Sequence, residues 1–132
     1  MRTETLSQAD PDFYPTFGPF FVSAEVRQAT GSAMTSEPGY RWTALQDAGQ
    51  TVAFAGLKPQ KNGGAEFVAV YAQGGNVEAK RLAVQAALDD AKGQRLTRVK
   101  ILAKLENADF YRDLGFESGP LRGGFIALEK TL

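Results

Sequence analysis

Asn107-Ala108-Asp109-Phe110-Tyr111-Arg112-Asp113-Leu114-Gly115-Phe116-Glu117 is the stretch that decides how the rest of the chain is interpreted. Its pattern predicts a short helix followed directly by a strand, with its first residue as a suitable N-cap. Phe110 and Leu114 stand four residues apart, so one helix face can bury both. Gly115 stands where a helix end favours a positive φ. Tyr111, next to one of these apolar anchors, is the residue of the stretch that can take part in chemistry.

The composition is that of an ordinary globular domain. The 132 residues are enough for one domain with a real hydrophobic core, and 43% of them are hydrophobic and 23% charged. The formal net charge is zero, so global charge favours no nucleic-acid or other charged partner. We predict a single domain over residues 1–132, with residues 1–9 as a tail or a first edge strand.

Two residue types are missing, and their absence removes several kinds of chemistry. The chain contains no cysteine and no histidine. Thiolate nucleophiles, disulfides, cysteine or imidazole metal sites and Ser-His-Asp catalysis are therefore excluded, and we expect no metal. Proton transfer must use carboxylates, tyrosine, lysine, the backbone or water.

No apolar stretch approaches the length of about 20 residues that spans a membrane. The first residues include Glu4 and lack the hydrophobic centre of a secretion signal. We therefore expect a cytoplasmic protein without a membrane partner.

Caps and turn residues divide the first half of the chain into short elements. Five aromatic side chains before Val22 are interpreted mainly as core, with a few of them lining a substrate groove. The predicted elements are two short helical pieces, the second from a Ser23 cap to Gly31, a loop at 32–39 that includes Ser32, a hairpin of Arg41–Leu45 and Thr51–Leu57, and a central strand at Ala65–Tyr71.

The second half adds a strand–helix–strand passage, which requires a parallel pair of strands. Its parts are a helix capped by Asn76 from Val77 to about Lys92 and closed by Gly93, a strand at Leu96–Ala103, the short helix described above and two final strands, the last at Gly123–Lys130. The predicted fold class is α+β: a mixed, mainly antiparallel sheet with one βαβ crossover and helices on both faces.

This order of elements, and the residues Asn107 to Phe116, resemble the GNAT (Gcn5-related N-acetyltransferase) superfamily over residues 10–130. The hairpin that ends in Val52–Leu57 is similar to the second and third strands of that family. A Tyr-Pro-x-Phe-Gly-x-Phe-Phe stretch from Tyr14, Trp42 on a strand and the closing Arg122–Phe125 resemble small phage and mobile-element members, among them the Mom-type DNA-modification enzymes.

The resemblance implies a CoA-dependent N-acyltransferase. Acetyl-CoA, as co-substrate, would lie in a V between the strands Ala65–Tyr71 and Leu96–Ala103. Its pyrophosphate would sit on N–H groups at the start of the following helix. Tyr111 matches the family tyrosine that protonates the departing thiolate. The remaining implied cofactor contacts are the backbone of Phe67, Val68 and Val70, and Asn107.

The phosphate loop departs from the family pattern, so we regard it as degenerate. Its best match begins at Asn76, which replaces a basic residue or glutamine, while Ala79 replaces the first glycine and Arg81 the final small residue. Glu78 adds a like charge beside a pyrophosphate. Lys80 and Arg81 would compensate by contacting phosphate directly. Gly74 and Gly75, just upstream, offer a shifted cradle, and the alternative is a capped helix without a ligand.

The catalytic base that an amine acceptor needs is assigned to Glu66, on the central strand near the V. The alternative is that Glu66 is a strand-end carboxylate facing solvent.

A run of basic residues without an acid among them lies between Ala91 and Leu105. It can be a patch that holds phosphates of CoA or of nucleic acid, but a solvated strand face explains it more simply. The residues are Lys92, Arg95, Arg98, Lys100 and Lys104.

Three functions follow as hypotheses. The first is acyl transfer from CoA to the amine of a small molecule or peptide. The second is a nucleic-acid-modifying, Mom-like relative. The third is a catalytically silent binding protein, with a homodimer formed through its last strands as one form of partner. The acceptor depends on loop shapes that the sequence does not reveal.

Overall fold

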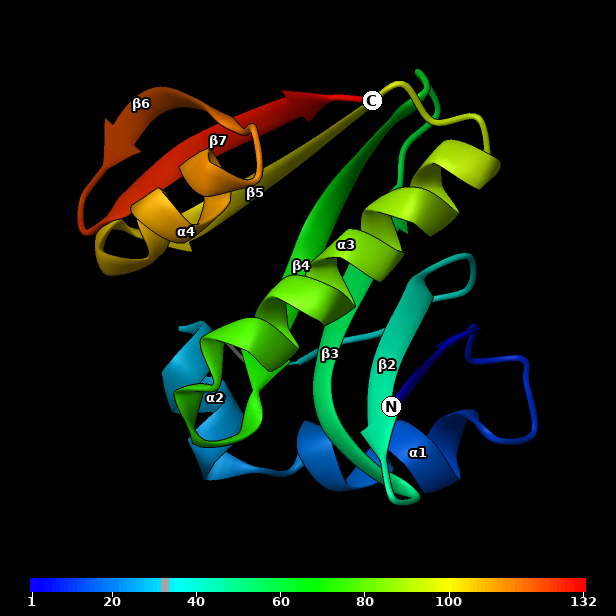
Figure 1. The fold of residues 1–132 in the computed structure, drawn as a ribbon. Helices are drawn as coiled ribbons and strands as arrows, with labels where there is room; N and C mark the ends of the chain where they lie inside the picture. Colours follow the sequence, from blue (N-terminus) through cyan, green and yellow to red (C-terminus); the bar gives the residue numbers. More distant parts are fainter. Residues whose placement is uncertain (32–33) are drawn as a thin grey trace.

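The computed structural model describes residues 1–31 and 34–132; of the predicted loop at 32–39, Ser32 lies outside the described residues. The chain forms one seven-stranded sheet with helices against it (Figure 1). The elements are β1 (Arg2–Leu6), α1 (Phe13–Phe21), α2 (Ala24–Thr30), β2 (Arg41–Asp47), β3 (Gln50–Pro59), β4 (Gly64–Ala72), the 3₁₀ turn η1 (Gln73–Gly75), α3 (Val77–Gly93), β5 (Arg98–Lys104), η2 (Leu105–Asn107), α4 (Ala108–Asp113), β6 (Glu117–Arg122) and β7 (Phe125–Thr131).

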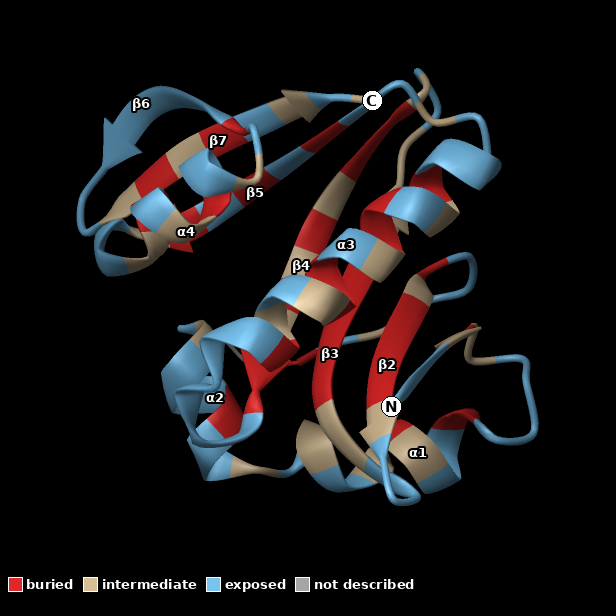
Figure 2. Ribbon diagram, viewed as in Figure 1, coloured by how far each residue is buried: buried red, intermediate tan, exposed pale blue. Residues whose placement is uncertain are grey.

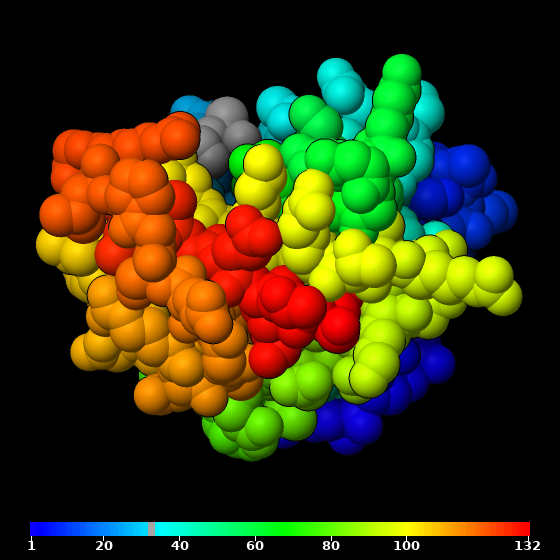
Figure 3. Space-filling view, turned by 90° about the horizontal axis from the view of Figure 1, so that it is seen from above, coloured from blue at the N-terminus to red at the C-terminus, as the bar shows by residue number. Residues whose placement is uncertain are grey.

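The sheet has the order β1-β2-β3-β4-β5-β7-β6. All neighbours are antiparallel except β4 and β5, which are joined through α3 and run parallel. The predicted α+β class with one βαβ crossover is therefore confirmed. β1 is an edge strand paired with β2, so the edge strand, and not the tail, describes the first residues. Seen from above, the C-terminal part of the chain forms one side of the molecule and the residues near the N-terminus lie on the other (Figure 3).

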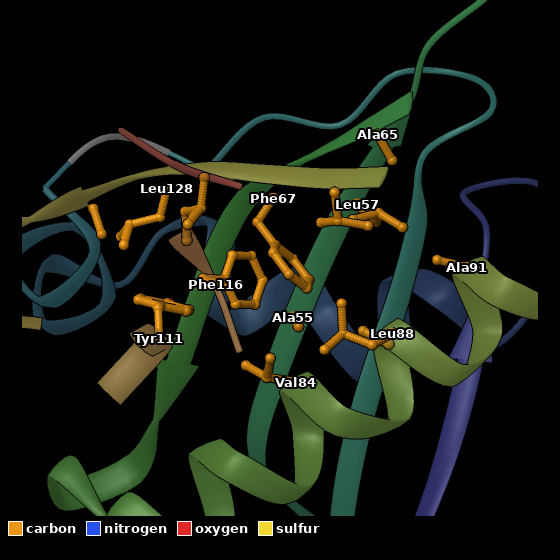
Figure 4. Close-up of a cluster of buried hydrophobic side chains, with 14 of the residues drawn as sticks. Ala55, Leu57, Ala65, Phe67, Val84, Leu88, Ala91, Tyr111, Phe116 and Leu128 are labelled. Atoms are coloured by element: carbon orange, nitrogen blue, oxygen red, sulfur yellow. The ribbon is translucent and has the colours of Figure 1, made fainter. Parts of the chain in front are cut away.

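Helices cover both faces of the sheet, as predicted. On one face α3 lies across β2, β3 and β4, and its buried stripe packs with α4, β5 and β7 in a continuous core (Figures 1 and 4). α1 lies against the opposite face with β2, β3 and β4. The middle parts of β2 and β3 are buried, whereas every residue of the outer strand β6 is exposed (Figure 2).

The N-terminal aromatic residues mostly fill the core of the second face. Phe13, Phe17 and Trp42 are fully buried, and the Trp42 ring packs flat over Gly56, where a Cβ would overlap it. α1 contains Pro19 inside its last turn, and α2 begins at the predicted Ser23 cap, whose Oγ accepts from the Val26 N–H at 3.2 Å. The core assignment of these aromatics is therefore correct.

Two adjacent strands separate inside the sheet. β4 and β5 pair only at their first three positions, from Gly64↔Arg98 to Glu66↔Lys100, and then diverge (Figure 1). On its other side β4 contains a β-bulge, because Gly56 pairs with Ala69 while the next residue of β3 pairs with Phe67. Val68 is thus the extra residue. The bulge lies where the strands part, a place where bulges often re-aim backbone and side chains.

The short helix differs in detail from the prediction. Asn107 has helical φ and ψ and makes no side-chain cap, because η2 already leads into α4. Phe110 and Leu114 are half-buried, and the anchors of the helix are instead Ala108 and Tyr111. Gly115 takes the predicted positive φ, at 92°.

The end of α3 also differs. Gly93 belongs to the helix, and the residue with positive φ is Arg95, at 63°. The strand predicted from Leu96 begins two residues later, at Arg98.

Candidate active site

A cavity of about 360 Å³ lies in the gap where β4 and β5 diverge. Five of the residues predicted from the sequence to bind cofactor line it. Glu66 and Tyr111, the two predicted catalytic residues, line it as well. The five are Phe67, Val68, Val70, Lys80 and Asn107. The cavity is therefore bounded by the bulged strand on one side and by the start of α4 on another.

Tyr111 is the most deeply buried polar side chain of this cavity, with 2% of its surface exposed. Its ring packs edge-on against Phe110, at a centroid distance of 5.0 Å. It packs in the same way against Phe116, at 5.5 Å (Figure 4). The hydroxyl makes no hydrogen bond to a described residue, yet the described part of the chain holds no fully buried side-chain oxygen without a partner. The hydroxyl therefore opens into the cavity that Tyr111 lines. Burial raises the pKa of Tyr111 above its ordinary value, so the phenol keeps its proton at neutral pH.

Lys80 lies on the first turns of α3 and points into the same cavity. Its Nζ lies 4.4 Å from the centroid of the Phe110 ring and 5.4 Å from that of Tyr111. Rings at these distances attract a cation through their negative faces. None of the ion pairs among the described residues involves Lys80. Burial lowers the pKa of Lys80, because the desolvated ammonium is disfavoured.

A second cavity, of about 520 Å³, adjoins the first and shares Lys80, Val70 and Asn107 with it. It extends to Gly74 and Gly75, which have φ values of 65° and 69°. A Cβ at either glycine would meet nothing within 4 Å, so the backbone of η1 faces open space. The two cavities together form one cleft from β5 to the start of α3, which we call the β4–β5 cleft.

Three predicted phosphate-loop residues do not line this cleft. Asn76 caps α3, because its Oδ1 accepts from the Ala79 N–H at 3.0 Å, and the Ala79 side chain is buried in the core. Arg81 lies on the exposed surface and is held by Glu78, with 3.0 Å between Arg81 Nε and Glu78 Oε2. The side chains of Asn76, Ala79 and Arg81 thus lie outside the cleft, and the residues of this stretch that line it are Val77 and Lys80.

Glu66 occupies the last position at which β4 and β5 pair, opposite Lys100. The next residue along β4, Phe67, belongs to the core under α3, so Glu66 faces the other side of the sheet. Glu66 thus enters the cleft from the face opposite to that of Tyr111.

The end of α2 closes the cleft on that opposite face, and the sequence did not reveal this role. Ala29, Thr30 and Gly31 line the cavity, and Lys104 Nζ donates to the Gln28 carbonyl at 2.7 Å, which ties α2 to β5. The N-terminal aromatic residues expected to line a groove lie elsewhere. The local sequence signal was Gly31 itself, which was predicted to end this helix. In the structure Gly31 takes a positive φ of 84° where α2 stops.

The basic run between Ala91 and Leu105 does not form an uninterrupted surface. Lys104 is engaged at α2, and Lys100 stands between Glu66 on β4 and Glu129 on β7 in the strand register. A solvated strand face explains these residues better than a phosphate-binding patch.

Over residues 1–31 and 34–132, no helix has both the length and the apolar composition needed to cross a membrane. Within the same ranges, no group of three or more acidic side chains is placed to hold a metal ion.

Comparison with known proteins gives a result for structure alone. No family model matches the chain, and no curated protein matches it in sequence. Solved structures, in contrast, match over almost the whole chain. The ribosomal-protein-alanine N-acetyltransferase from Brucella melitensis aligns with a TM-score of 0.72 and 14% identity, over 100% of both chains. An acetyltransferase of the GNAT family from Staphylococcus aureus aligns with a TM-score of 0.70 and 11% identity, over 99% of both chains.

The fold is that of the GNAT acetyltransferases. A third neighbour with this fold, PaiA N-acetyltransferase from Thermoplasma acidophilum, was solved in complex with coenzyme A and aligns with a TM-score of 0.68, at 14% identity and over 100% of both chains. At such identities the likeness establishes the GNAT fold, and the activity has to be argued from the cleft itself.

Proposed function

We propose that this protein transfers an acyl group from a pantetheine thioester, such as acetyl-CoA, to an amine. The observation that carries the proposal is the buried Tyr111, whose hydroxyl opens into a cleft between two diverging strands. A phenol that opens into a cleft and has no partner among the described residues is free to donate its proton to a ligand there. The GNAT fold of the chain, shared with acetyltransferases, supports the same class of reaction.

In the proposed reaction the amine nitrogen attacks the thioester carbonyl carbon, a C–N bond forms and the C–S bond breaks. Tyr111 gives its proton to the departing thiolate, and Glu66 takes the proton of the amine, directly or through a water. The two groups enter the cleft from opposite faces of the sheet. This arrangement supports direct transfer, with the donor on the side of α3 and the acceptor on the side of α2.

The β-bulge of β4 supports the proposal that this strand binds the pantetheine arm of the acyl donor. Because Val68 is an extra residue in β4, the strand has backbone groups outside its ladder with β3, and β4 has already lost β5 as a partner beyond Glu66. Free N–H groups of this kind pair with an amide-containing arm and polarise a carbonyl. Phe67, Val68 and Val70 are the residues whose backbone we assign to this contact.

The acceptor is expected to be the amine of a small molecule or a peptide, admitted beside Glu66 and the end of α2. No feature of the described residues favours the nucleic-acid alternative over this one.

The experiment is a thiol-release assay with acetyl-CoA at millimolar concentration and a panel of primary amines, with the acylated product identified by mass spectrometry. Amine-dependent release of thiol together with an amide product is the expected result. Absence of product with every amine, in a sample that is folded by circular dichroism, would reject acyl transfer and favour a silent binding protein.

A further inference from the structure

The charges along the β4–β5 cleft run opposite to those that a CoA molecule needs. Near β5, the cavity is lined by Lys80, Lys104 and one carboxylate, Glu66. Near the start of α3, where the helix dipole would attract an anion, the lining side chains include one cation and three carboxylates. The cation is Lys80 again, and the carboxylates are those of Glu25, Glu106 and Asp113.

The other basic residue at this end is already bound. Arg81 pairs with Glu78 on the exposed surface of α3 and lies outside the cleft. Two of the backbone N–H groups at the helix start are also occupied, since the Ala79 N–H donates to the Asn76 side chain and the Lys80 N–H donates to the Asn76 carbonyl. Among the residues that line the helix end of the cleft, Lys80 is therefore the single cation presented to an incoming anion.

Lys80 is held in position for one anion. Its ammonium lies over two rings, Phe110 and Tyr111, and its side chain is shared by both cavities, so its charge stands between the acyl end and the helix end. An anion at this place would pair with it in a partly desolvated setting, where charge-assisted contacts are strong. An anion placed beyond Lys80, in the second cavity near the start of α3, would instead meet the carboxylates of Glu106 and Asp113.

From this distribution we infer that the preferred donor is an acyl thioester of phosphopantetheine, with a single phosphate that pairs with Lys80, and not the fully phosphorylated CoA. This inference rests on the proposed acyl transfer and names its donor. CoA extends the same arm by a second phosphate and a phosphorylated nucleoside, and that extension would pass the three carboxylates. The phosphopantetheine arm can come as a free molecule or attached to a carrier protein, and both share the chemistry that Lys80 recognises.

The experiment compares four donors with one accepted amine: acetyl-CoA, free acetyl-phosphopantetheine, acetyl-pantetheine without phosphate, and an acetylated carrier protein. We expect kcat/KM to be about 10-fold higher with free acetyl-phosphopantetheine than with acetyl-CoA, because like charges within a few ångströms oppose binding. A still higher value with the carrier protein would identify the source of the arm. Equal or better use of acetyl-CoA would overturn the inference and leave the proposed function standing. Transfer from none of the donors would remove both.

Two variants separate the attraction between Lys80 and the phosphate from the repulsion between the cleft carboxylates and the rest of CoA. Lys80→Met is expected to lower kcat/KM about 10-fold with acetyl-phosphopantetheine and much less with acetyl-pantetheine, since only the former has a phosphate to lose its partner. The double variant Glu106→Gln, Asp113→Asn is expected to improve acetyl-CoA more than acetyl-pantetheine. Asp47→Asn, at the exposed last residue of β2, is the matched control and should change neither. Equal effects of Lys80→Met on both donors would contradict a phosphate contact.

Discussion

Tyr71 and Tyr111 are both deeply buried, 6% and 2% exposed, but they lie in regions of different character. Tyr71 belongs to the aromatic cluster around Trp42 on the face of α1 and also lines the second cavity, but its hydroxyl is engaged within the protein, since it donates to Glu25 Oε1 at 2.8 Å. Tyr111 lies on the other face, and its hydroxyl opens into the β4–β5 cleft without a partner among the described residues.

Burial of a tyrosine therefore does not by itself indicate a structural or a catalytic role. The decisive difference is whether the hydroxyl binds a protein group, as in Tyr71, or opens into a cavity that a ligand can enter, as in Tyr111. We expect changes in the Trp42 cluster to affect stability and changes at Tyr111 to affect turnover.

The largest expected effect is on the Trp42 cluster. Trp42→Ala removes a fully buried ring that packs against Phe13, Phe17 and Phe54. The free energy of unfolding should fall by about 3–5 kcal/mol, measured by urea denaturation. Tyr14→Ala, at an exposed aromatic of α1, is the control, and a loss no larger than that control would mean that this cluster is not the core of its face.

Tyr111→Phe should lower kcat about 100-fold, the size expected for loss of a general acid. Stability should change little, because the hydroxyl has no partner to lose. Tyr14→Phe, which removes an exposed hydroxyl far from the cleft, serves as the control in both measurements. Unchanged turnover in Tyr111→Phe would remove the acid role and leave this tyrosine as a core residue.

Tyr71→Phe should show the reverse pattern. Losing the hydrogen bond to Glu25 is expected to lower the free energy of unfolding by about 1 kcal/mol, because the exposed Glu25 is rehydrated. A larger loss of stability in Tyr111→Phe than in Tyr71→Phe, in the same denaturation experiment, would contradict the assignment of Tyr71 as the structural tyrosine and Tyr111 as the catalytic one.

The smallest effect concerns alkaline pH. Burial and the bond to Glu25 raise the pKa of Tyr71 from 10.0 to about 12, so the folded protein holds this proton when the unfolded chain has lost it. The contribution of this raised pKa to the free energy of unfolding is fully present below pH 10. It is lost as the pH rises toward 12. By about pH 11 the wild type should have lost up to about 1 kcal/mol relative to Tyr71→Phe. Parallel pH profiles of the two proteins would show that Tyr71 titrates normally.

Much of the fold was predictable because local signals and the global fold agree. The turn between β2 and β3 has Ala48 and Gly49 at φ 52° and 80°, as a two-residue hairpin loop requires, and the sequence marks it with Asp and Gly. Ser23, Asn76 and Gly115 likewise act at the ends of helices where they were expected.

The cleft was only partly predictable, because its shape depends on contacts between distant segments. The bulge at Val68 lies in an almost entirely apolar strand, so no alternation of polar and apolar residues signals it. Lys80 was expected to meet phosphate, but its place over Phe110 and Tyr111 arises only when α3 and α4 pack on the same face. Asn76 and Arg81 were also expected to meet phosphate, but their side chains bind short-range partners, the Ala79 N–H and Glu78, and lie outside the cleft.

The most direct test of the central claim is to locate ligand binding by backbone amide chemical shifts. The ligand is a non-transferable thioether analogue of acetyl-phosphopantetheine, titrated into the labelled protein. We expect the largest shifts at Phe67, Val68 and Val70, with further shifts at Gly74 and Gly75 along the second cavity. Shifts confined to the outer face of β5, β6 and β7, or none at millimolar ligand, would contradict the assignment of the β4–β5 cleft as the donor site.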